Sequence, residues 1–125
     1  MCGMKTFLVL ALTSAFAAPA RADINQLQTF ATCAGRLSAL MEYEWMFDGP
    51  ASEVTMTQRA SLIDLIQAVM EPDQAPDVLH WRIAAKQAHA VLLSRATFND
   101  DPSDAAWAKA QAARLSQECT GLLLS

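Results

Sequence analysis

The 125-residue chain carries 9 Lys and Arg against 13 Asp and Glu, giving a formal net charge of -4, and 53% of its residues are hydrophobic. An acidic chain with scattered cations does not offer the basic face that nucleic acids require, which argues against DNA or RNA as a partner. The length suits one hydrophobic core, and therefore one domain, once a targeting segment is removed.

Residues 1–22 have the pattern of a cleaved signal peptide. Lys5 supplies a positive start, residues 7–18 form an apolar run, and residues 20–22 (Ala-Arg-Ala) provide the small-x-small motif before a cut. The apolar run is shorter than the roughly 20 residues that span a bilayer, so an uncleaved anchor is the less favoured alternative. The sequence predicts a single domain over residues 23–125, periplasmic or secreted, with no membrane association after cleavage.

Two cysteines, Cys33 and Cys119, belong to the predicted mature domain. In an exported protein such a pair more often forms a disulfide than a metal site. Both fall on apolar sides of predicted helices. We therefore predict a disulfide between them, with two separate buried thiols as the main alternative and reactive redox thiols as a more distant one.

Proline-containing breaks at residues 48–50, 71–76 and 100–102 divide the mature domain into four segments. Apolar residues recur in these segments every three or four positions, and no segment shows the alternation expected of a strand. The predicted helices cover about residues 24–47, 52–70, 76–98 and 102–122.

The predicted first helix carries an apolar stripe that ends at Trp45, and residues 42–47 are interpreted as a lid over one end of the core. Gly35 in its interior is either a tolerated defect or a point of close approach by another helix. In the second helix, Arg59 shares a side with Leu62 and Ile66. The stripe of the first helix consists of Leu27, Phe30, Ala34, Leu37, Met41 and Trp45.

Four helices with short connections predict an all-α fold, most simply an antiparallel four-helix bundle. In that topology the last helix lies beside the first and runs in the opposite direction. Cys33 and Cys119 then fall at similar heights, so one disulfide joins the first helix to the last.

The third helix is apolar on two sides, with a narrow basic stripe between them. Such a helix is normally buried all round, which a small bundle does not achieve. One reading is an exposed partner surface; the other is plain packing, with the stripe paired to acids such as Asp64 or Glu118. The candidate partner surface consists of Leu79, Trp81, Arg82, Ile83, Lys86 and His89.

No motif of a nucleophile elbow, phosphate loop, haem attachment or zinc protease is present, so we predict no catalytic, cofactor-binding or metal-binding residues. His80 and His89 lie nine positions apart, on opposite sides of one helix, and cannot share a metal. We predict a non-catalytic interaction module, such as an accessory subunit, assembly factor or inhibitor, that binds a protein or a second copy of itself. The alternative is a carrier of a small ligand, metal or haem in the bundle core.

Overall fold

The computed structural model describes Gly3 and residues 23–124, and every regular element among these residues is helical. This confirms the all-α prediction for that part of the chain. The predicted signal peptide, residues 1–22, lies outside the described residues except for Gly3. None of the described helices is both long enough and apolar enough to cross a lipid bilayer. The elements are α1 (Ile24–Phe47), α2 (Gly49–Val69), the 3-10 helix η1 (Pro72–Gln74), α3 (Ala75–Thr97) and α4 (Pro102–Leu122).

The predicted limits are correct for α1 and α4, whereas α2 begins at Gly49 instead of Ser52. The reason is Asp48, which ends one helix and caps the next. Its backbone N–H donates to the carbonyl of Glu44 at 2.7 Å, and its side chain accepts from the N–H of Ala51 at 3.2 Å. The corner between α1 and α2 is therefore a single residue.

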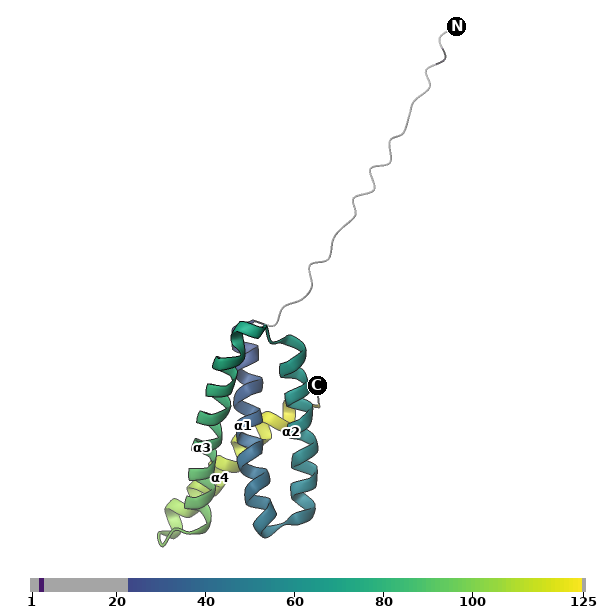
Figure 1. Ribbon diagram of the computed structural model, residues 1–125. Helices are drawn as coiled ribbons and strands as arrows, with labels where there is room; N and C mark the ends of the chain where they lie inside the picture. The colour runs from purple at the N-terminus through teal and green to yellow at the C-terminus, as the bar shows by residue number, and fades with distance from the viewer. Residues whose placement is uncertain (1–2, 4–22, 125) are drawn as a thin grey trace.

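α1 is the central helix, with α2 and α3 on its two sides and α4 crossing behind it (Figure 1). Cys33, Ala34 and Gly35 are consecutive and all buried, so the middle of α1 is covered on more than one side. A single stripe is therefore too narrow a description of this helix. The last residue of the predicted stripe, Trp45, does not belong to the core, because its side chain is 59% exposed.

The predicted lid over residues 42–47 is likewise wrong, since Trp45, Met46 and Phe47 are all exposed. The corner at Asp48 turns the chain away, and although the ring centroid of Phe98, the C-cap of α3, lies 6.4 Å from that of Phe47, these side chains stay exposed. Phe47 instead packs beside Tyr43 on its own helix, with ring centroids 4.8 Å apart.

Contacts between α1 and α2 join residues in reverse order along the two helices. Thr55 donates to the Glu44 carboxylate at 2.5 Å, near the corner, and Arg59 donates to the Ser38 hydroxyl at 2.6 Å, further from the corner on both helices. Figure 1 shows that α3 runs in the same direction as α1, opposite to α2.

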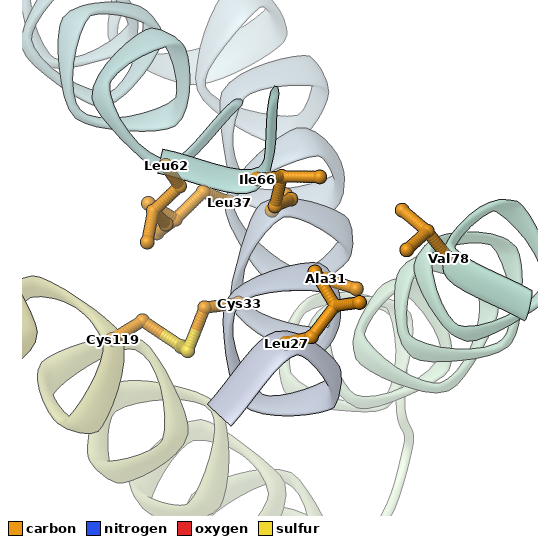
Figure 2. Packing of buried hydrophobic residues seen from close by; sticks show 9 residues of the cluster. Leu27, Ala31, Cys33, Leu37, Leu62, Ile66, Val78 and Cys119 are labelled. Atoms are coloured by element: carbon orange, nitrogen blue, oxygen red, sulfur yellow. A yellow bond between two sulfur atoms is a disulfide. The ribbon is translucent and has the colours of Figure 1, made fainter. Parts of the chain in front are cut away.

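The main core forms where all four helices meet (Figure 2). Leu37 of α1 lies beside Leu62 and Ile66 of α2. Cys33 and Cys119 belong to the same cluster and lie within disulfide distance, with their Cα atoms 5.2 Å apart, as the sequence predicted. The buried members of the cluster are Leu27, Ala31, Cys33, Ala34, Leu37, Leu62, Ile66, Val78 and Cys119.

Gly35 allows α3 to approach α1 closely. A Cβ atom at this position would lie 3.0 Å from both the Cβ of Ala85 and the backbone nitrogen of Lys86, and would overlap the carbonyl oxygen of Arg82. Glycine costs a helix interior about 1 kcal/mol relative to alanine. The close contact with α3 explains its presence, so Gly35 is not a tolerated defect.

α4 slants across α1 (Figure 1). Its contacts with α3 are more extensive than its contacts with α1. Arg95 of α3 donates to both carboxylate oxygens of Asp104 in the first turn of α4, at 2.6 and 3.2 Å. A second small core cluster, formed by Ala39, Leu93 and Ala112, lies where α1, α3 and α4 meet. The oblique crossing leaves space beside this cluster.

Candidate functional site

A groove of about 170 Å³ lies over α1, between α2 and α3. We call it the arginine groove. Its floor is the close contact at Gly35, and Arg59 of α2 faces it from one side. Of the six residues predicted to form a partner surface, the structure brings four together here. The arginine groove is lined by Gly35, Ser38, Arg59, Leu79, Arg82, Ile83 and Lys86.

Two exposed apolar side chains form the α3 edge of the arginine groove. Leu79 is 56% exposed and Ile83 is 47% exposed, and because they are four residues apart they lie side by side on the helix surface. Trp81, also predicted for the partner surface, is half-buried and packs against the main core. Leu79 and Trp81 therefore belong to different faces of α3.

Two cations of the arginine groove, Arg59 and Arg82, lie close together without a matching acid among the described residues. Burial lowers the pKa of Arg82, and the positive charge of Arg59 lowers this pKa further. Arg59 donates to the hydroxyl of Ser38, which itself donates to the carbonyl of Ala34 at 2.7 Å. Within the described part of the chain, no carboxylate pairs with either guanidinium. An anion placed between the two guanidinium groups would offset both their mutual repulsion and the free-energy cost of burying the Arg82 charge.

The basic stripe predicted on α3 does not form one surface, because it lies on the side of α3 that faces α1. Lys86 pairs with Glu42 of α1 at 2.6 Å. His89 is 1% exposed, so its assignment to the partner surface is wrong. The predicted acid partners are also different: Glu118 pairs with Arg36 and Arg114 instead.

His89 joins α3 to α4 inside the fold. Its Nε2 atom lies 3.1 Å from the Ser116 hydroxyl, and its buried Nδ1 atom has no hydrogen-bond partner among the described residues. Burial lowers the pKa of His89 to about 4, and the nearby charge of Arg36 contributes to the shift. A base this weak, with no group orienting its second nitrogen, is poorly suited to activate a serine at neutral pH. The pair is better understood as a structural contact.

Among residues 23–124, no three His, Cys, Asp or Glu side chains lie close enough to hold a metal ion. Arg59 is the site residue that sequence reasoning missed. Its position on the apolar side of α2, in line with Leu62 and Ile66, was the signal that could have identified it. Comparisons with protein-family models, curated proteins and solved structures find no match to this chain.

Proposed function

We propose that this protein is an exported, non-catalytic interaction module whose arginine groove binds an acidic, partly apolar segment of a partner protein. One observation carries the proposal: Arg59 and Arg82 converge without a described carboxylate, beside the exposed side chains of Leu79 and Ile83. Guanidinium groups bind carboxylates through two parallel hydrogen bonds. Exposed aliphatic groups beside them offer a place for an apolar side chain of the same segment.

Export is the second part of the proposal. It rests on the signal-peptide pattern of residues 1–22 and on the cysteine pair, which suits an oxidising compartment. The cut after residue 22 leaves Asp23 as the first residue, and the Asp23 side chain accepts from the N–H of Gln26 at 2.7 Å as the N-cap of α1. In this proposal, the mature protein is an antiparallel bundle that starts with its own helix cap. Mass spectrometry of protein from the cell envelope should find Asp23 as its N-terminal residue.

The arginine groove is tested by co-purification from an envelope extract. Arg82→Gln removes one groove cation, and Arg114→Gln removes one cation from the exposed side of α4, so the two variants have equal net charge. We expect the partner to be retained by wild type and Arg114→Gln and lost from Arg82→Gln. Loss of charged hydrogen bonds should weaken binding at least about tenfold. Equal retention by both variants would contradict the proposal.

The apolar edge is tested by a second pair of variants. Leu79→Glu changes an exposed side chain, so it should abolish partner retention without lowering the melting temperature. Trp81→Glu places a charge against the core and should lower the melting temperature. If Leu79→Glu also destabilises the fold and leaves retention intact, the groove edge is not a binding surface. Sedimentation of the purified protein determines whether the partner is a second copy of this chain.

A further inference from the structure

A second groove, of about 560 Å³, lies between α1, α3 and α4 and shares no lining residue with the arginine groove. We call it the alanine groove. It exists because α4 slants across α1 (Figure 1) and because small side chains face the space that this crossing opens. Its volume lies in the range of pockets that hold small molecules. It is lined by Leu40, Tyr43, Leu93, Ala96, Thr97, Lys109, Ala112, Ala113, Ser116 and Gln117.

The floor of the alanine groove is apolar. Leu93 and Ala112 are buried members of the second core cluster, and Leu40 packs against them. Ala96 and Ala113 extend this apolar surface on α3 and α4. These side chains offer only aliphatic carbon atoms, so a ligand lying on the floor would make van der Waals contacts with them.

The hydroxyl groups that line the alanine groove already have partners within the protein. The hydroxyl groups of Tyr43 and Thr97 hydrogen-bond to each other at 2.8 Å, and Ser116 contacts His89. The exceptions among the polar groups of the described lining residues are the exposed side-chain amide of Gln117 and the ammonium group of Lys109. Of the described residues that line the groove, Lys109 alone carries a charge, and its ammonium group has neither a hydrogen bond nor an ion pair within the described chain.

Along α4, the positive charge of Lys109 comes first and the apolar surface of the groove follows it. Lys109 lies nearer the start of the helix, and Ser116 lies two turns further on, roughly 10 Å along the axis. Ala112 and Ala113 lie between them. A ligand that follows the groove therefore meets the positive charge of Lys109 at one end and the carbon surface of the two alanines next to it, before the polar side chains of Ser116 and Gln117.

We infer that the alanine groove binds a single-chain carboxylate amphiphile, with its head group at Lys109 and its hydrocarbon chain over Leu93 and Ala112. A neutral apolar molecule would leave Lys109 without an anion. A highly charged ligand would leave the apolar floor uncovered. This site is separate from the arginine groove, because the two grooves share no lining residue and use different stretches of α3.

The test is a titration of the full mature protein with dodecanoate, below its micelle-forming concentration, followed by calorimetry. We expect saturable binding of one molecule per chain. Ala113→Phe fills the groove from an exposed position and should weaken binding at least tenfold. Ala110→Phe is the matched control, because Ala110 is exposed on the same helix and does not line the groove.

Lys109→Gln tests the head-group contact in a variant that leaves the groove open. It should weaken dodecanoate about two- to fivefold, the range for an exposed ion pair, and leave the binding of dodecanol unchanged. Arg82→Gln should leave dodecanoate binding unchanged, which separates this site from the proposed function. Circular dichroism checks that each variant keeps its helix content.

Three results would overturn the inference. One is the absence of saturable dodecanoate binding to the wild-type protein. Another is equal binding to Ala113→Phe and Ala110→Phe. The third is a dimer that Ala113→Phe dissociates in the absence of carboxylate, because the groove would then be an interface between copies of this chain.

Discussion

The guanidinium groups of Arg59 and Arg82 come from helices on opposite sides of α1, yet the charge of Arg59 lowers the pKa of Arg82. The fold therefore disfavours the charged form of a side chain that is always charged in water. Binding sites often contain such unfavourable arrangements, because a ligand supplies the missing interaction.

We predict that Arg82→Met makes the unliganded protein more stable, by about 0.5 kcal/mol, the scale of a partly exposed charge interaction. Removing the guanidinium ends both the repulsion by Arg59 and the desolvation cost. Urea denaturation measures the change. Lys86→Met is the control, since Lys86 pairs with Glu42 and its loss should not raise stability. A less stable Arg82→Met protein would mean that Arg82 has favourable contacts that outweigh the repulsion.

The second prediction concerns the contact between α1 and α3. Gly35→Ala should destabilise the fold by about 1–3 kcal/mol, because the added Cβ meets the backbone of α3, which cannot move without shifting the helix. This outweighs the gain of about 1 kcal/mol in helix propensity. Gly121→Ala in α4 is the matched control. No atom lies within 4 Å of its Cβ position, so this variant should show only the stabilisation that comes from the higher helix propensity of alanine. Thermal denaturation of both variants gives the comparison, and a stabilised Gly35→Ala protein would contradict the close approach.

The third prediction is a pH dependence. Burial, helped by the charge of Arg36, lowers the folded-state pKa of His89 from its ordinary value of 6.5 to about 4, so the fold disfavours the protonated form. The associated stability is fully present above pH 6.5 and is lost as the pH falls towards about 4. Its total is roughly 3 kcal/mol, from about 1.4 kcal/mol per pKa unit.

His89→Gln stays neutral at every pH and keeps a polar group near Ser116. The stability of this variant should therefore fall less than that of wild type between pH 6.5 and 4, the values that bracket the His89 shift. His80→Gln, at an exposed position, should follow the wild-type curve. Urea denaturation across the pH range measures all three proteins, and identical curves for wild type and His89→Gln would show that His89 does not titrate as the structure indicates.

The helix limits were predictable where local chemistry sets them. Asp101 caps α4 and Pro102 fills its first turn, and both signals are contained in neighbouring residues. The arrangement of the helices was not predictable in this way. Whether Trp45 is covered depends on what lies beyond the Asp48 corner, and the convergence of Arg59 and Arg82 depends on how α2 and α3 pack on α1. Periodicity gives the side of a helix on which a residue lies, but not which neighbouring element covers that side.

The last prediction concerns Cys33 and Cys119, which are both buried and are separated by 86 positions in the sequence. A disulfide closing so long a loop stabilises a domain by about 4–5 kcal/mol in the chain-entropy treatment, because it restricts the unfolded chain. Cys33→Ser and Cys119→Ser should each lower the unfolding free energy by similar amounts, and the double variant should be little less stable than either single variant. Two independent buried thiols would instead give costs that add. Thiol counting on the unfolded, unreduced mature protein is the direct measurement: no free thiol is expected, and two free thiols would mean that α4 is held against α1 by packing without a covalent bond.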